Sequence, residues 1–254
     1  VAMEHHKLHA GCAFYRSGFT EAVAVVIDGA GTFIPMEINR ESTYGFETET
    51  VFNCNYPADF GVVYKHLGTR GPNTTSFLTE KNADGTEYEI AISDRAGITK
   101  VYEAVTQYCG FSAIEAGKTM GLFPYGKENK KIPALFDDLG KIPLSNRNLI
   151  VPTYPNAALV NDGKYDYLYT SGDLQNSKVD LTTLENRRDL AYAVQDQSQQ
   201  EVLKLIFKAV EMTGNKNVVL SGGYALNCVA NYWYLDKLNK EDIKLYVEPV
   251  SSDA

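Results

Sequence analysis

The sequence lacks several features that would assign it to common classes of protein. Its four cysteines form no CxxC pair, so we expect free thiols in a reducing cytoplasm rather than a disulfide framework; they are Cys12, Cys54, Cys109 and Cys228. No apolar run reaches the roughly 18–20 residues of a membrane span, so no membrane partner is expected. The net charge of −8 and the lack of a basic stripe argue against a nucleic-acid partner.

The residues that are present describe a globular chain of 254 residues, 44% hydrophobic and 22% charged. Helical periods, short apolar runs and glycine turns alternate, which is typical of an α/β fold with parallel strand pairs. We expect helices over 4–15, 97–108, 183–213 and 224–238, and strands over 21–27, 32–38, 47–54, 218–220 and 244–247. Residues 73–95 are either a hairpin or an inserted loop, residues 118–126 a loop, and residues 128–180 an irregular surface excursion.

Three of the four histidines fall within five residues, at His5, His6 and His9. On a helix, His5 and His9 share a face because they are four residues apart, so both side chains can bind one metal ion. His6 points elsewhere. Paired histidines without a metal are common, and a site needs at least one more protein ligand, which spacing alone does not identify.

Glycine-bearing turns provide candidate phosphate sites. Asp28-Gly-Ala-Gly31 follows a strand, and such a turn exposes backbone N–H groups, although an Asp-Gly hairpin turn alone explains it. Ser221-Gly-Gly223 lies between a strand and a helix, where the helix dipole favours an anion; a tight connection is an equally good interpretation. The Gly117–Gly126 loop offers Lys118, which is more simply a solvated lysine. The sequence has neither a Walker loop nor a GxGxxG motif.

Together these segments resemble the O-carbamoyltransferases of the nodulation-factor and antibiotic type. HHKLHA at 5–10 resembles the family's HHxxHA, and DGAG at 28–31 resembles its DGxG turn. GKTMGLFPYG at 117–126 is similar to GKTMGLAPYG, and SGGYALNCVAN at 221–231 to SGGVALNCVAN. Pro249 and Asp253 resemble the beginning of a closing P…DAG motif. The resemblance therefore spans the whole chain.

The resemblance implies an actin-like ATPase fold, here partial, with mixed sheets flanked by helices. It implies that residues 1–254 are part of the N-terminal domain of a two-domain enzyme. The first strands of that domain and a YrdC-like C-terminal domain would lie outside this sequence, and without them the chain is expected to be inactive. The resemblance implies that the YrdC-like domain makes carbamoyl adenylate from carbamoyl phosphate and ATP. The N-terminal domain would then transfer the carbamoyl group to a hydroxyl of a small-molecule acceptor. A sugar or metabolite kinase of the same fold and a non-catalytic nucleotide-binding module are the alternatives.

Residue by residue, the resemblance implies a divalent metal, expected to be Fe²⁺, held by His5, His9 and Asp253. The nucleotide would be contacted by Asp28, Gly29, Gly31, Lys118, Gly222, Gly223 and Asn227. Thr32 stands where the family usually has Glu, which puts a role of that side chain in doubt. Neither the resemblance nor the residue pattern identifies a general base or the acceptor.

Overall fold

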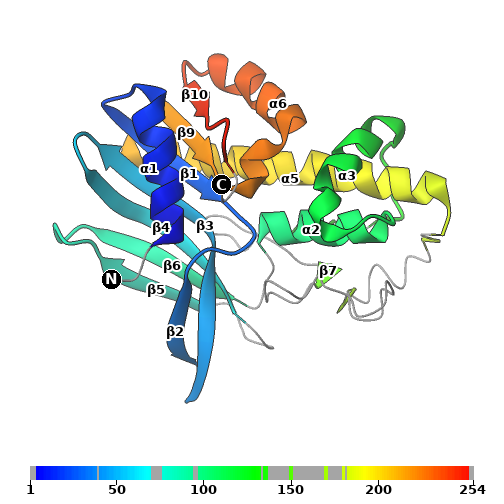
Figure 1. Cartoon of the computed structure of the whole chain (residues 1–254), viewed down its shortest axis with the longest axis horizontal. Coiled ribbons are helices and arrows are strands. Elements are labelled where there is room, and N and C mark those ends of the chain that lie inside the picture. The colour runs from blue at the N-terminus through cyan, green and yellow to red at the C-terminus, as the bar shows by residue number, and fades with distance from the viewer. Residues whose placement is uncertain are drawn as a thin grey trace. The chain divides into compact units, whose positions relative to one another are not determined.

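The computed structural model describes residues 4–38, 40–69, 76–93, 97–132, 134–136, 149–150, 169–170, 179–180 and 182–251. The chain divides into two compact units, one formed by residues 1–94 with 203–254 and the other by residues 95–202 (Figure 1). The expected α/β class is confirmed.

The first unit is built on an eight-stranded mixed sheet, with the order β10-β9-β1-β3-β4-β6-β5 and with β2 also paired to β3. The strands β10, β9 and β1 run parallel, whereas β1 and β4 lie antiparallel to β3 on either side of it. The strands are β1 (Glu21–Ile27), β2 (Phe33–Ile38), β3 (Glu41–Asn55), β4 (Asp59–Thr69), β5 (Ser76–Lys81), β6 (Glu87–Ser93), β9 (Asn217–Ser221) and β10 (Lys244–Val247).

The expected hairpin between β1 and β2 is wrong. Both strands pair with β3 instead: β1 lies along Glu49–Asn55 and β2 continues in the same direction along Glu41–Phe46. Between them, the five residues 28–32 lie opposite the two residues 47 and 48 of β3. The glycines therefore form a bulge in one long antiparallel ladder. Pairing with a distant strand decided this arrangement, and the local turn signal does not reveal it.

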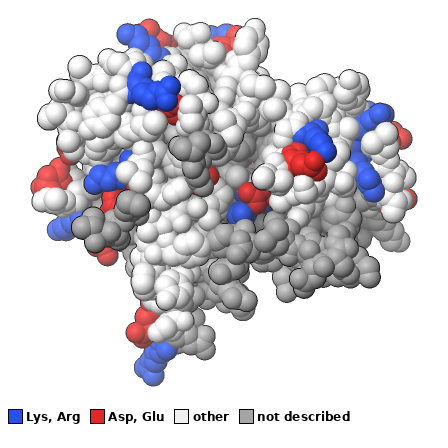
Figure 2. Space-filling view, in the orientation of Figure 1, with Lys and Arg blue, Asp and Glu red and all other residues white. Residues whose placement is uncertain are grey.

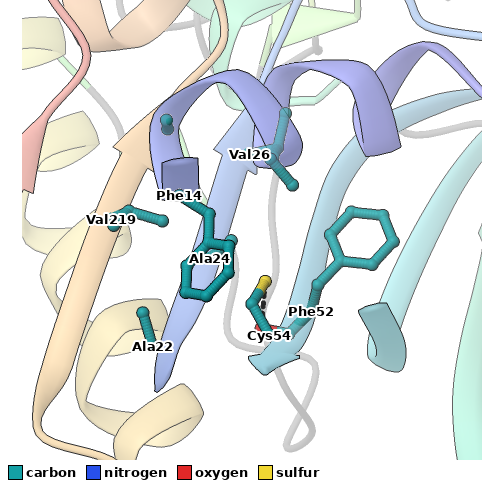
Figure 3. Close-up of a cluster of buried hydrophobic side chains, with 9 residues drawn as sticks. Phe14, Ala22, Ala24, Val26, Phe52, Cys54 and Val219 are labelled. Atoms are coloured by element: carbon teal, nitrogen blue, oxygen red, sulfur yellow. Dashed lines mark hydrogen bonds between the residues drawn. The ribbon is translucent and has the colours of Figure 1, made fainter. Parts of the chain in front are cut away.

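The helix α1 (His5–Ser17) covers one face of this sheet (Figure 1). The small and apolar residues beneath it alternate along β1, because successive strand residues point to opposite faces. The Phe14 ring lies over β1 in a cluster of buried side chains to which the neighbouring strands β3 and β9 also contribute (Figure 3). Its buried members are Ala10, Ala13, Phe14, Ala22, Ala24, Val26, Phe52, Cys54 and Val219. The alanines allow the helix to approach the strands closely.

The elements from residue 184 onward follow the predicted order of long helix, strand, glycine turn, helix and strand, although the second helix begins at Cys228 rather than at Tyr224. The long helix α5 (Leu184–Thr213) ends before Gly214, whose φ of +69° is the left-handed conformation of a glycine C-cap. Then β9 leads through a short 3₁₀ turn, η3 (Gly223–Leu226), into α6 (Cys228–Asn239) and β10. Of the two alternatives for residues 73–95, a hairpin or an inserted loop, the described residues 76–93 form the hairpin, with β5 and β6 paired antiparallel.

The second unit contains α2 (Ile98–Tyr108), η1 (Ala113–Glu115), α3 (Ala116–Leu122), η2 (Phe123–Tyr125), residues 184–202 of α5 and the two short strands β7 (Leu149–Ile150) and β8 (Tyr169–Thr170). The loop expected over 118–126 is wrong, because these residues are mostly helical. A capping box between Ser112 and Glu115 starts this helical stretch, a signal that the glycines concealed. Most of the expected excursion over 128–180 lies outside the described residues.

The part of the chain that the structure describes contains no helix long and apolar enough to cross a membrane. On the face shown in Figure 2, basic and acidic side chains lie interspersed among uncharged ones.

Candidate metal and anion site

The two histidines of the expected pair meet at the N-terminal end of α1. Their Nε2 atoms lie 3.1 Å apart, and the rings contact edge to face with centroids 4.7 Å apart. The helix places them on one side because they are separated by four residues. His5 is partly exposed, whereas His9 is buried. The pair therefore presents two ring nitrogens at one point near the surface.

Asp28 joins these histidines from the end of β1. It follows Ala22, Ala24 and Val26 on the sheet face that α1 covers. Its Oδ2 atom lies 3.0 Å from His5 Nε2 and 3.8 Å from His9 Nε2. The three candidate ligand atoms all lie within 4.8 Å of one another. The family resemblance implies a contact between Asp28 and the nucleotide, and the structure places Asp28 beside the two histidines.

The turn after β9 also reaches Asp28. The Gly223 N–H donates to Asp28 Oδ1 over 3.1 Å, so the carboxylate contacts histidine on one side and a backbone amide on the other. Gly222 has a φ of +88°, and a β-carbon there would lie 2.3 Å from the Ile27 carbonyl oxygen. Only glycine fits this close approach. The two glycine-bearing segments of the sequence are therefore neighbours.

The electrostatics of the site keep Asp28 ionised. Burial alone would raise its pKa, but the contact with His5, the nearby His6 and the amides of Gly29 and Gly223 together hold the pKa well below its usual value. A carboxylate that stays charged while 8% exposed is suited to a cation.

His6 has a different environment from its two neighbours. It is fully buried, and its Nδ1 atom lies 2.8 Å from the Thr50 hydroxyl. Burial is the main cause that lowers its pKa to about 4, so the ring is neutral near pH 7. The ring packs over Gly31, where a β-carbon would lie 2.6 Å from His6 Cδ2. Gly31 therefore makes room for a side chain, a role that the turn pattern does not indicate.

The sequence pattern does not indicate two further functional candidates, Glu47 on β3 and Lys65 on β4. Lys65 Nζ lies 2.6 Å from Glu47 Oε1, and the Glu47 side chain is 1% exposed. The sequence signal was weak: both are charged residues inside otherwise apolar strand patterns. A buried charged pair of this kind contributes little net stability, because desolvation opposes it, so we treat both residues as functional candidates.

The remaining predicted residues have other surroundings. The Asn227 side chain accepts the Ala230 N–H over 3.1 Å and so caps α6. Lys118 belongs to the second unit, where it is exposed and forms an ion pair with Glu115. Asp253 lies outside the described residues, so its role as a ligand stays a prediction.

The 117–126 motif has a clear packing role inside the second unit. A β-carbon at Gly126 would lie 2.0 Å from the Arg188 carbonyl oxygen, so only glycine fits against α5 there. Phe123 stacks on Tyr192 with ring centroids 5.7 Å apart. Asp189 accepts hydrogen bonds from Lys127 N and Asn129 Nδ2. Part of this long motif is therefore explained by how the segment packs on α5.

A family model described as the carbamoyltransferase N-terminus matches residues 1–254. The chain belongs to this family. It is 26% identical over 99% of its length to an uncharacterised protein of Synechocystis sp., of which it covers 34%. It is 24% identical to the nodulation protein NolNO of Sinorhizobium fredii, over 99% of the chain and 29% of that protein. It is also 24% identical to the nodulation protein NolO of Bradyrhizobium diazoefficiens, over 99% of the chain and 36% of that protein.

The chain thus spans about a third of the length of the curated relatives that it matches. Among solved structures, it is similar to full-length HypF in a phosphate- and nucleotide-bound form, with a TM-score of 0.53 and 11% identity. That likeness covers 97% of this chain and 39% of HypF. The carbamoyltransferase family and this likeness establish the expected actin-like fold.

Proposed function

We propose that the intact protein is a carbamoyltransferase that passes a carbamoyl group from carbamoyl adenylate to a hydroxyl of a small-molecule acceptor. Carbamoyl phosphate and ATP would be the sources of the adenylate, formed by a YrdC-like domain. Membership of the carbamoyltransferase family supports the reaction class. Activation as an adenylate makes chemical sense, because it gives the carbamoyl carbon a better leaving group before a weakly nucleophilic hydroxyl attacks.

The cluster of His5, His9 and Asp28 is the observation that carries this proposal. Two imidazole nitrogens and an ionised carboxylate are donors that suit Fe²⁺ and Zn²⁺, and their atoms are close enough to bind one ion. When bound, such an ion would polarise a phosphoryl or carbonyl oxygen. Asp253 remains a proposed further ligand, and Fe²⁺ the proposed metal.

The turn at Gly222 and Gly223 would orient the nucleotide next to this cluster. It has no side chain at two successive positions, so a phosphate can approach the backbone closely. Its amide Gly223 N is already directed at Asp28, which fixes the turn against the end of β1. Gly29 and Gly31 lie in the 28–32 bulge nearby, and Asn227 would act indirectly by starting α6. Lys118 remains a proposed phosphate contact.

The test is metal content in the intact protein. His9→Ala should lose at least nine-tenths of the bound iron, because it removes one of the three candidate ligand atoms and alanine offers no donor in its place. His6→Asn is the comparison: its amide keeps a polar group near Thr50, and it should lose less iron than His9→Ala because His6 is not one of the three candidate ligands. Elemental analysis of anaerobically purified, folded protein measures both. Equal iron in the wild type and in His9→Ala would reject the metal site.

A further inference from the structure

We propose that Glu47, paired with Lys65, is a positioning residue that holds the start of α1 against the 28–32 bulge and so fixes His5, His9 and Asp28 relative to one another. The inference rests on the proposed metal site. Glu47 does not contact the three candidate ligands; it acts on the backbone that carries them.

The first observation is how α1 begins. The first N–H groups of a helix have no acceptor within the helix, and Glu4 at the N-cap provides no side-chain hydrogen bond. The His5 N–H donates instead to Thr32 Oγ1 over 2.8 Å, and the His6 N–H lies 3.4 Å from Glu47 Oε2. The start of α1 is therefore capped by residues from the bulge and from β3.

The second observation is that Glu47 also forms hydrogen bonds with the 28–32 bulge. The same Oε2 atom accepts the Thr32 N–H over 3.0 Å. The Glu47 carbonyl accepts the Gly31 N–H over 2.8 Å, and the Glu47 N–H donates to the Thr32 carbonyl over 3.3 Å. One residue of β3 thus binds both the helix that carries His5 and His9 and the segment that begins at Asp28.

The third observation is that the junction is tight and charged. A β-carbon at Gly31 would lie 2.8 Å from Glu47 Oε2, so no side chain fits between the bulge, His6 and Glu47. Lys65 supplies the charge that a buried carboxylate needs, and a carboxylate near a helix N-terminus is favoured by the helix dipole. An apolar side chain at position 47 would occupy the same volume as Glu47 but would leave the His6 and Thr32 N–H groups without their carboxylate acceptor.

The experiment compares Glu47→Gln with Glu49→Gln in the intact protein. Glu49 is the matched control, because it is also a buried carboxylate on β3 but contacts Thr48 and His66. We expect Glu47→Gln to weaken Co²⁺ binding, followed by its visible absorption, at least tenfold. In metal-free protein it should also speed amide exchange in residues 4–9 more than in residues 10–17. Glu49→Gln should do neither at matched global stability.

Unchanged Co²⁺ affinity in Glu47→Gln, or equal weakening in Glu49→Gln, would overturn the positioning role. Should Glu47→Gln not fold, Thr32→Val tests the same junction by replacing the hydroxyl that accepts the His5 N–H with a methyl group. Thr32→Val should weaken Co²⁺ binding about threefold or more. Thr32→Ser keeps the hydroxyl and should bind Co²⁺ as tightly as the wild type. Failure of the wild type to bind Co²⁺ would reject the proposed metal function, while the exchange data would still decide whether Glu47 holds α1 to the bulge.

Discussion

The two ends of α1 lie on the same face of one sheet, yet they cover different chemistry. Toward its C-terminus, α1 packs Ala10, Ala13 and Phe14 against apolar strand residues, and we call this cluster the apolar end (Figure 3). Beneath the N-terminal half is a polar end, formed by His6, Thr50, Glu47, Lys65 and Asp28, all of which are buried. The same strands supply both ends: β1 carries Ala22 and leads directly into Asp28, and β3 carries both Thr50 and Cys54.

The contrast separates stability from function. Burying Phe14 contributes about 2–3 kcal/mol of hydrophobic free energy, whereas a buried ion pair contributes little net stability because desolvation opposes it. The apolar end can therefore hold the helix on the sheet, and the polar end can hold side chains ready for a ligand at a cost in stability. The following variants test this division of roles.

The largest effect should come from Phe14→Ala. Because Phe14 is fully buried in the apolar end, its truncation should lower the free energy of unfolding of the first unit by about 3–5 kcal/mol. Urea titration measures this loss, and Co²⁺ affinity of the remaining folded protein should be unchanged. Leu8→Ala on the same helix is the control, since Leu8 is 58% exposed and its loss should change stability by less than about 0.5 kcal/mol. Equal losses would mean that the apolar end does not anchor α1.

Gly31→Ala should damage both stability and binding. Its methyl group would overlap the His6 ring and the Glu47 carboxylate, so we expect a loss of about 1–3 kcal/mol together with weaker Co²⁺ binding. Gly11→Ala in the middle of α1 is the matched control. Its nearest neighbours are 3.9 Å away, so alanine should raise stability by about 0.5–1 kcal/mol through its higher helix propensity. A Gly31→Ala protein as stable as the wild type would show that the junction is loose.

A loss of stability no larger than that of Gly31→Ala is expected from Thr50→Val, which leaves the buried His6 Nδ1 without its Thr50 hydroxyl partner. The free energy of unfolding should fall by about 1–3 kcal/mol, whereas Thr50→Ser keeps the hydroxyl and should lose less. The double variant His6→Leu/Thr50→Val replaces both polar partners and should recover part of the loss. Full additivity of the two single variants would show that His6 and Thr50 do not interact. Thermal and urea unfolding of the four proteins complete this cycle.

The smallest perturbation is chemical labelling of the thiols. Cys12 and Cys228 are exposed and should react rapidly with a thiol reagent near pH 8. Cys54 in the apolar end and Cys109 in the second unit are buried, and burial raises the pKa of each to about 12. Their labelling should be at least a hundredfold slower in native protein. Phe14→Ala should speed the labelling of Cys54 and leave Cys109 unchanged; rapid native labelling of Cys54 would show that the apolar end opens readily.

Much of the architecture was predictable because it depends on local patterns. The apolar run at 21–27, the helical period over 183–213 and the glycine that ends it predicted β1 and α5 closely. The spacing of His5 and His9 predicted that the rings share one side of α1. The loop predicted over 118–126 is wrong, because glycines are tolerated within a helix where the Ser112 capping box and packing on α5 support it.

What the sequence by itself determined was therefore the order of elements, the histidine pair and the glycine turns, since each depends on residues a few positions apart. Only the tertiary structure decided that β1 and β2 share β3 as a partner, which converts a presumed hairpin turn into a bulge. It alone brought Asp28 to the histidines, and Glu47 to the start of α1, 41 residues away in sequence. Register between distant strands sets these contacts, and no local propensity encodes that register.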